Sequence, residues 1–254
     1  MCDPLTQGVE LPRREMTLFY LVDTSGSMSG AKIAALNTAV RETIPIIKEI
    51  SKSNSDAKIR VAVLEFSSGC DWMYPEPKQV QEFEWRDLQA GGLTALGEAY
   101  NELSQKLSQS HGFMMEASGS FAPVIILLSD GIPTDDEKYG LNKLKQNKWF
   151  NVATKIAIAI GDEAKKETLI DFTSNDEAVL TVHNIDDLKK IIRMVSVTAS
   201  RVNSRNASAG KDAPEKSQET IDTIQDGIEN DPTLIKVDVG TSTQNKGTDI
   251  WNWP

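Results

Sequence analysis

Continuous apolar runs that stop at an aspartate constrain the fold of this chain more than any other feature. Thr17–Val22 (TLFYLV) is followed by Asp23, and Ala122–Ser129 (APVIILLS) is followed by Asp130. Ala153–Ile160 (ATKIAIAI) is a third run of this kind. Such runs are typical of strands that are buried on both faces of a parallel sheet. They predict the core of an α/β domain.

Segments with helical periodicity separate these runs. A long helix is expected over Ala31–Ser53, with Ser29 as its N-cap and a kink at Pro45. The other expected helices are Ala95–Leu107, Asp136–Phe150, Lys166–Thr173 and Ile185–Ser200. The other expected strands are Lys58–Ser67, Ala178–Val182 and, as a weaker edge strand, Val80–Trp85. This alternation predicts a doubly wound, mostly parallel sheet with helices on both faces.

Composition divides the chain into an N-terminal extension (1–15), one α/β domain (16–200) and a C-terminal tail (201–254). Arg201–Lys216 is rich in Ser, Asn, Ala and Gly and is typical of a linker. Further along, the tail has its own pattern. Three isoleucines have helical spacing, and three residues alternate as in a strand: Ile221, Ile224 and Ile228, then Ile235, Val237 and Val239. The tail therefore either packs back on its own domain or docks on a partner, in which case Trp251 and Trp253 are candidate anchors.

Charge and cysteine content restrict the possible partners and the compartment. The formal net charge is −10, which argues against a nucleic-acid or anionic-membrane binder because such binders need clustered Lys and Arg. Cys2 and Cys70 cannot form a disulfide framework, and the N-terminus has no apolar stretch typical of a signal peptide. The longest apolar run, Val124–Leu128, is too short to span a bilayer. We expect a cytoplasmic protein.

Hard oxygen donors gather where the expected strands end. Asp23-Thr24-Ser25-Gly26-Ser27 places one carboxylate and the hydroxyls of Ser25 and Ser27 in a tight turn, and such hard oxygen donors suit Mg²⁺. Taken alone, this turn is equally consistent with Asp and Ser side chains that cap backbone amides. Asp130 follows another buried strand, and Thr94 lies in the glycine-rich segment Gly91–Gly97. If the two strands are neighbours where the winding of the sheet reverses, these side chains converge.

The three segments together resemble the metal-ion-dependent adhesion site of von Willebrand factor A (vWA) domains. The matching motifs are D-T-S-G-S-M, G-x-T-x-L and S-D-G-x-P-T-D, and they are most similar to the bacterial TerY type, which is associated with tellurite resistance and stress operons. The resemblance covers about residues 16–200. It implies that Ser25, Ser27 and Thr94 give hydroxyl oxygens to Mg²⁺ (or Mn²⁺ or Ca²⁺). It also implies that Asp23 and Asp130 bind the ion directly or through water, and that the sheet has one antiparallel edge strand.

The function that this resemblance implies is a metal-dependent protein–protein interaction module, not an enzyme. An open metal position would bind an Asp or Glu of a protein partner, in a bacterial stress-response, tellurite-resistance or phosphorylation signalling system. TerY-type operons often include a Ser/Thr protein kinase and a metal-dependent (PP2C-type) phosphatase, which makes both candidate partners. The tail offers these candidate phosphorylation sites: Thr220, Thr223, Thr233, Thr241, Ser242, Thr243 and Thr248.

Two alternatives use the same site differently. One is a metal-dependent hydrolase or phosphotransferase. However, a haloacid dehalogenase-type enzyme needs a second Asp at the position of Ser25, and Gly26–Lys32 lacks the P-loop pattern. The other alternative is the helper subunit of an AAA-type ATPase, which the chain length disfavours. His111 and His183 are interpreted as ordinary surface or edge residues, and Cys70 as unreactive. Asp135 and Asp136 are expected to cap the helix that follows them.

Overall fold

A central mixed sheet organises the protein in the computed structural model, which describes residues 13–115, 119–205, 213–234 and 236–240. Its strand order is β3-β2-β1-β5-β6-β7-β8, with β4 also paired to β2. The strands are β1 (Arg14–Asp23), β2 (Ala57–Phe66), β3 (Cys70–Trp72), β4 (Lys78–Gln79), β5 (Val124–Ser129), β6 (Thr154–Ile160), β7 (Val179–Val182) and β8 (Val237–Val239). The five central strands, β2, β1, β5, β6 and β7, are parallel, and β3, β4 and β8 are antiparallel to their neighbours. The expected doubly wound, mostly parallel sheet is confirmed.

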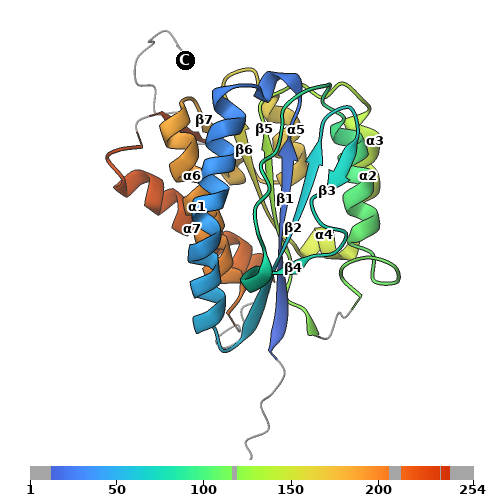
Figure 1. The fold of residues 1–254 in the computed structure, drawn as a ribbon, viewed down its shortest axis with the longest axis vertical. Coiled ribbons are helices and arrows are strands. Elements are labelled where there is room, and N and C mark those ends of the chain that lie inside the picture. The colour runs from blue at the N-terminus through green and yellow to red at the C-terminus, as the bar shows by residue number, and fades with distance from the viewer. Residues whose placement is uncertain (1–12, 116–118, 206–212, 235, 241–254) are drawn as a thin grey trace, which may run out of the picture.

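Helices cover both faces of this sheet because the side chains of its strands alternate between the faces. In β1, Leu18 and Tyr20 belong to one buried cluster, whereas Phe19 and Leu21 belong to the other. Helices α1, α6 and α7 contribute to the first cluster, and α2, α3, α4 and α5 to the second (Figure 1). Their bounds are α1 (Ala31–Ser53), α2 (Leu96–Lys106), α3 (Glu137–Leu144), α4 (Lys148–Val152), α5 (Lys166–Thr173), α6 (Ile185–Asn203) and α7 (Ala213–Asn230). Short 3₁₀ helices are η2 (Gly26–Met28), η3 (Val80–Glu82) and η5 (Asp176–Ala178).

The prediction of an edge strand over Val80–Trp85 is wrong. Its first residues form η3, and the antiparallel strands at this edge are β3 and β4, both paired with β2. Val80 and Phe83 are both fully buried, and their spacing of three residues suits a helical turn better than an alternating strand. A second antiparallel edge is formed by β8 on β7. It contains Val237 and Val239, two of the residues that alternate as in a strand, and it agrees with the alternative that the tail packs back on its own domain.

Two helix boundaries also differ from the expectation. Ser29 ends η2, and α1 begins after Gly30, whose φ of 78° favours glycine. The expected helix Asp136–Phe150 is divided into α3 and α4, because the side chain of Asn147 accepts hydrogen bonds from two amides of α4 and starts a new helix there. Helix α1 continues through Pro45.

The described part of the C-terminal tail is packed on the domain. Helix α7 packs against α6 and buries Ile221, Ile224 and Ile228, the three isoleucines with helical spacing. Strand β8 then pairs with β7. Gly240 follows so closely against Asp176 that an added Cβ would lie 1.9 Å from the Asp176 carbonyl oxygen. Ile235, Trp251 and Trp253 lie outside the described residues.

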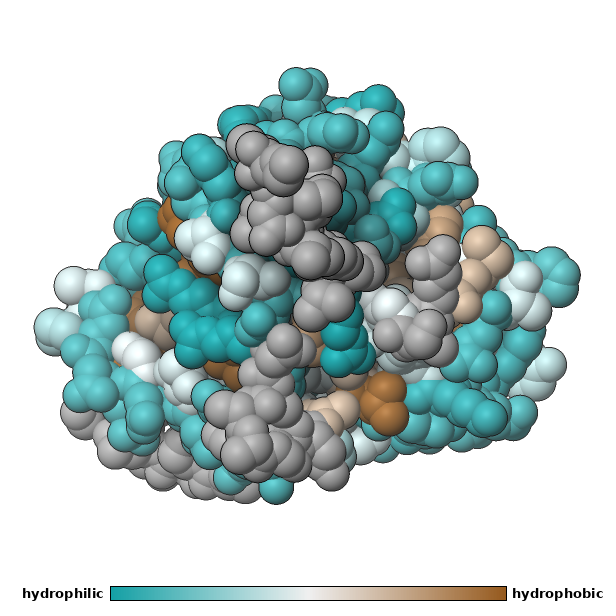
Figure 2. All heavy atoms as spheres, turned by 90° about the horizontal axis from the view of Figure 1, so that it is seen from below, coloured by the Kyte–Doolittle hydropathy of each residue, from teal (hydrophilic) through white to brown (hydrophobic). Residues whose placement is uncertain are grey.

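The two ends of the parallel strands differ in character. The strands begin at the lower end of Figure 1 and finish at its upper end, where the loops that carry Asp23 and Asp130 lie. The lower face, seen in Figure 2, is largely hydrophilic, with only isolated apolar residues where the described surface is visible. Among the helices of the described ranges, none combines the length and apolar character that a membrane span needs.

Candidate metal centre

Two buried carboxylates meet where the winding of the sheet reverses. From β1 the chain goes to β2 on one side, and it later returns to β5 on the other side. Val22 of β1 is paired with Leu128 of β5, so Asp23 and Ser129 follow at the same level, and Ser129 Oγ donates a hydrogen bond to Asp23 Oδ2 (2.6 Å). The side chain of Asp130 comes next, and both aspartates are almost completely inaccessible to solvent. Such a crevice is the usual ligand site of an open α/β sheet.

The loop after β1 joins these two carboxylates through hydroxyl groups. Asp23 Oδ1 accepts a hydrogen bond from the backbone amide of Ser25 (2.9 Å), which fixes the turn. Ser25 Oγ and Ser27 Oγ are 2.9 Å apart, and Ser27 Oγ donates to Asp130 Oδ1 (2.7 Å). The side chains predicted from the D-x-S-x-S pattern therefore form one continuous polar chain.

The loop that carries Thr94 is held against the first loop by backbone contacts. The amide of Gly26 donates to the carbonyl of Gly92 (3.1 Å), and the amide of Gly91 donates to the carbonyl of Thr24 (2.8 Å). Gly92 has a φ of 83°, and a Cβ there would lie 2.6 Å from Ser68 Oγ. Only glycine fits this position without rearrangement. Thr94 itself is buried beside the two aspartates.

The oxygen donors surround a common point beside Gly131, as the surroundings of a Cβ atom placed on this glycine show. A Cβ on Gly131 would lie 3.3 Å from Thr94 Oγ1, 3.5 Å from Ser27 Oγ and 3.8 Å from Asp23 Oδ2. Asp23 and Ser27 lie in the loop after β1, Thr94 lies in the loop before α2, and Gly131 itself follows Asp130 after β5. The three oxygens are hard donors of the kind that Mg²⁺, Mn²⁺ and Ca²⁺ prefer. The residues present therefore fit a divalent cation of this kind.

The electrostatics of the site also favour a cation. Burial raises the pKa of Asp23, hydrogen bonds from Ser129 and Ser25 oppose this effect, and the charge of Asp130 adds to it. Two buried carboxylates so close together are expensive to ionise without a positive charge. In the described parts of the chain, no group of three or more His, Cys, Asp or Glu side chains could hold a metal, so the hydroxyls are essential to this donor set.

The comparisons with known proteins agree with this architecture. Residues 18–194 match the family profile of the von Willebrand factor type A domain. The chain belongs to this family. No match was found among curated protein sequences.

Solved structures support the vWA fold. This domain resembles a von Willebrand factor type A structure from Catenulispora acidiphila, with 18% identity and a TM-score of 0.55, over 74% of this chain and 43% of that one. It also resembles the ArnB paralog VWA2 from Sulfolobus acidocaldarius, with 18% identity and a TM-score of 0.51, over 70% and 44% of the two chains. A third neighbour is proximal thread matrix protein 1 from the mussel byssus with a zinc-occupied MIDAS motif, with 19% identity and a TM-score of 0.54, over 73% and 48%. The chain thus spans less than half of each of these structures.

Several residues that support the vWA site were not singled out from the sequence. The side chain of Asn37 in α1 donates a hydrogen bond to the carbonyl of Leu88 and accepts one from its amide. It also accepts a hydrogen bond from Trp85 Nε1. These contacts anchor the connection that leads to Thr94. Thr134 exchanges two hydrogen bonds with Thr94. None of these contacts has a local sequence signal, because each joins segments far apart in the chain.

The two aspartates after the third motif serve different helices. The side chain of Asp136 accepts from the amide of Tyr139 and caps α3, as expected. Asp135 instead accepts from the amides of Gly97 and Glu98 at the start of α2. Its expected role as a cap of the following helix was therefore wrong, because the close packing of α2 on α3 brings another helix start within reach.

Cys70 and the histidines lie outside the candidate centre. Burial, followed by the charges of Glu98 and Glu102, raises the pKa of the Cys70 thiol to about 12, which agrees with an unreactive thiol. His111 is exposed and contacts Ser110. His183 is largely buried at the end of β7, with Nδ1 2.8 Å from Asp162 Oδ1 and Nε2 3.0 Å from Asp238 Oδ2 of β8.

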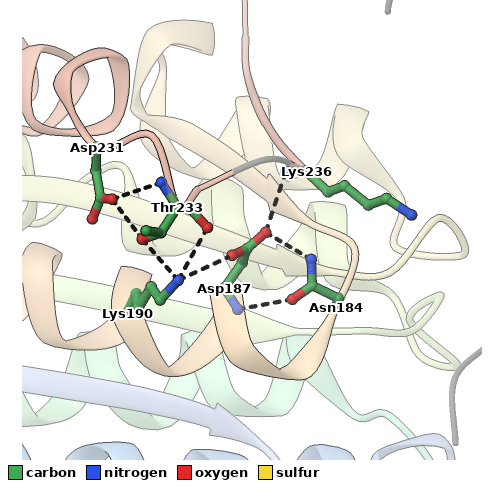
Figure 3. A network of polar contacts seen from close by, with 6 residues as sticks. All are labelled: Asn184, Asp187, Lys190, Asp231, Thr233 and Lys236. Atoms are coloured by element: carbon green, nitrogen blue, oxygen red, sulfur yellow. Dashed lines mark hydrogen bonds and ion pairs between the residues drawn. The ribbon is translucent and has the colours of Figure 1, made fainter. Parts of the chain in front are cut away.

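The tail threonines occupy different environments. Thr220 is fully buried, and its hydroxyl is hydrogen bonded to Lys216 and Asn203, so a kinase cannot reach it in the folded domain. Thr223 is exposed on α7. Thr233 is exposed in the connection to β8, where a polar network joins this connection to the start of α6 (Figure 3). That network consists of Asn184, Asp187, Lys190, Asp231, Thr233 and Lys236. The other candidates, Thr241, Ser242, Thr243 and Thr248, lie outside the described residues.

Two large apolar side chains are exposed beside the candidate centre. Leu93 directly precedes Thr94 and is 59% exposed, and Ile132 lies two residues after Asp130 and is 62% exposed. The hydrogen bonds between Thr94 and Thr134 hold their two loops together. Both side chains therefore present apolar surface next to the candidate ligands.

Proposed function

We propose that this vWA domain is a metal-dependent protein–protein interaction module. Asp23, Ser25, Ser27, Thr94 and Asp130 would hold Mg²⁺, with Mn²⁺ or Ca²⁺ as substitutes, and an Asp or Glu side chain of a partner would complete the coordination. The bound ion would supply the positive charge that lets an acidic protein bind an acidic residue. The observation that carries this proposal is the convergence of oxygen donors from the loop after β1 and from the Thr94 loop beside Gly131, with Asp130 bound to the same cluster through Ser27.

The rim of the site supports a protein as the partner. Leu93 and Ile132 would contact apolar groups next to the partner's carboxylate, since both are exposed beside metal-ligating positions. We propose no catalytic role, because Ser25 stands where a phosphotransferase of the haloacid dehalogenase type needs its acid–base aspartate. Turnover of a generic phosphate ester that is lost in Asp23→Ala would contradict this part of the proposal.

A direct experiment measures thermal unfolding with Mg²⁺ and with EDTA. A ligand that binds only the folded state raises the unfolding temperature, so Mg²⁺ should stabilise the wild type and leave Asp23→Ala unaffected. A pull-down with and without EDTA then tests the partner side of the proposal. Equal stability and equal partner binding in EDTA and in Mg²⁺ would refute the metal-dependent function.

We also propose a cellular setting, which is more specific than the interaction function itself. The TerY-like motifs support a cytoplasmic adaptor or scaffold in a bacterial stress-response or tellurite-resistance system, with a Ser/Thr kinase and a PP2C-type phosphatase as partners. Among the described candidates, phosphorylation is then expected at the exposed Thr223 or Thr233 and not at the buried Thr220. Mass spectrometry after co-expression with a kinase from such an operon is the test, and a tail without phosphate would contradict the kinase partnership.

A further inference from the structure

A lysine ammonium group already lies against one of the carboxylates that would bind the metal ion. Lys32 Nζ lies 2.6 Å from Asp130 Oδ2, and the side chain of Asp130 is fully buried while that of Lys32 is only 17% exposed. The other oxygen of Asp130 accepts the hydrogen bond from Ser27. Both oxygens of this candidate ligand are therefore engaged, one by an ammonium group and one by a hydroxyl.

The position of Lys32 is unfavourable for a cation unless Asp130 compensates. Lys32 is the second residue of α1, and the first turn of this helix contains no acidic side chain. The positive end of the helix dipole lies at that turn and disfavours a lysine there. A positive group held at such a place, with its charge directed to a buried carboxylate, indicates a role that depends on that contact.

We propose that Lys32 is a built-in competitor of the metal ion for Asp130, an inference that rests on the metal-binding function proposed above. Without a metal, the two carboxylates of Asp23 and Asp130 face the single positive charge of Lys32. A divalent cation that enters must share Asp130 with the ammonium group or displace it. Lys32 thus stabilises the metal-free site and weakens metal binding, so that occupancy follows the concentration of free metal.

The test uses the full chain with Lys32→Gln and Lys32→Met, which remove the charge, and Lys32→Arg, which keeps it. Lys48→Gln is the control, because Lys48 lies about four turns further along the same helix. Calorimetric titration with MgCl₂ gives the dissociation constant, and thermal unfolding in EDTA gives the stability of the metal-free protein.

Opposite shifts in the two measurements are the signature of competition. Both uncharged variants should bind Mg²⁺ about twofold to fivefold more tightly than the wild type, the range expected for an ion pair with one partly exposed partner. In EDTA, both should unfold at a lower temperature, since Asp130 has lost its counter-charge. Lys32→Arg and Lys48→Gln should match the wild type in both measurements.

The outcomes separate this inference from the proposed function. If the wild type binds Mg²⁺ and the uncharged variants bind it equally or more weakly, Lys32 is not a competitor. If no protein binds Mg²⁺, the metal-binding function fails. Unfolding in EDTA then still decides whether Lys32 stabilises Asp130. An uncharged variant that folds only with Mg²⁺, while Lys48→Gln folds without it, supports the inference.

Discussion

The switch point between β1 and β5 and the packing of α7 near the far edge at β7 and β8 both bury side chains, but these side chains differ in their chemistry. At the switch point, the buried groups include Asp23 and Asp130. The amide of Ser25 and the hydroxyl of Ser129 donate hydrogen bonds to Asp23, and Ser27 and Lys32 donate to Asp130. At the far edge, α7 buries Ile221, Ile224 and Ile228 against the same core that α1 and α6 form. The first arrangement costs stability, because polar groups leave water, whereas the second adds to it.

This difference separates binding from folding within one domain. The polar loops bury two carboxylates close together, and the apolar tail contributes stability at a distance from them. Substitutions in the two regions should therefore be distinguishable by whether their effect depends on Mg²⁺. The predictions below follow from this contrast.

The largest effect is expected from Ile224→Ala. Ile224 is 2% exposed, and the truncation of a buried isoleucine should lower the free energy of unfolding by about 3 kcal/mol. Urea unfolding measures this loss, and the stabilisation by Mg²⁺ should remain as in the wild type. Thr223→Ala, on the exposed side of the same helix, is the control and should change stability by less than about 0.5 kcal/mol. A loss in Ile224→Ala that is as small as the loss in Thr223→Ala would mean that α7 does not pack on the domain.

A slightly smaller effect is expected from Asp23→Asn in the presence of metal. The wild type should gain about 2.7 kcal/mol at a Mg²⁺ concentration one hundred times the dissociation constant, and the variant should gain nothing. Thermal or urea unfolding with and without EDTA measures both gains. If the variant keeps the full gain, the metal does not bind at Asp23. The switch point would then not differ from the tail in its dependence on Mg²⁺.

The same variant should behave differently without metal. Burial raises the pKa of Asp23. A carboxyl whose pKa is raised by folding contributes stability that is present below its unfolded pKa and is lost as the pH rises through its folded pKa. In EDTA near neutral pH, Asp23→Asn should therefore be more stable than the wild type, by less than the gain that the wild type obtains from Mg²⁺.

This difference should shrink as the pH falls toward the ordinary range of an aspartate. Unfolding curves of both proteins in EDTA, recorded over a series of acidic to neutral pH values, test the sign. If the wild type is the more stable protein at neutral pH without metal, the hydrogen bonds from Ser129 and Ser25 outweigh the burial of the charge.

Much of this fold was predictable because the central strands carry their own signal. The runs that end at Asp23 and Asp130 are apolar without interruption, as strands covered on both faces must be. The rules of doubly wound sheets predicted that these two strands are neighbours. This pairing in turn predicted that the residues of the loops after them converge. The edge was not predictable in the same way. Strands β3 and β4 are only three and two residues long, too short for a period of two to be seen.

The contacts that the sequence did not predict all depend on tertiary placement. Lys32 and Asp130 are 98 residues apart, and nothing local to either marks the pair. Asp135 precedes a helix that it could cap, yet the close packing of Gly97 against Gly140 brings α2 nearer. Local sequence propensity cannot decide which of two helix starts Asp135 caps, because the choice depends on where the other helix lies.

The smallest effect is expected at the polar contact between the far edge and the end of β7. Asp238 of β8 lies 3.0 Å from His183 Nε2, but its side chain is 59% exposed, so solvent screens the pair. Asp238→Asn should therefore lower the free energy of unfolding by only about 0.5 kcal/mol, well below the loss in Ile224→Ala. Asp226→Asn, on an exposed position of α7, is the matched control. A loss as large as that of Ile224→Ala would show that this polar contact attaches the tail to the domain as strongly as a buried isoleucine does.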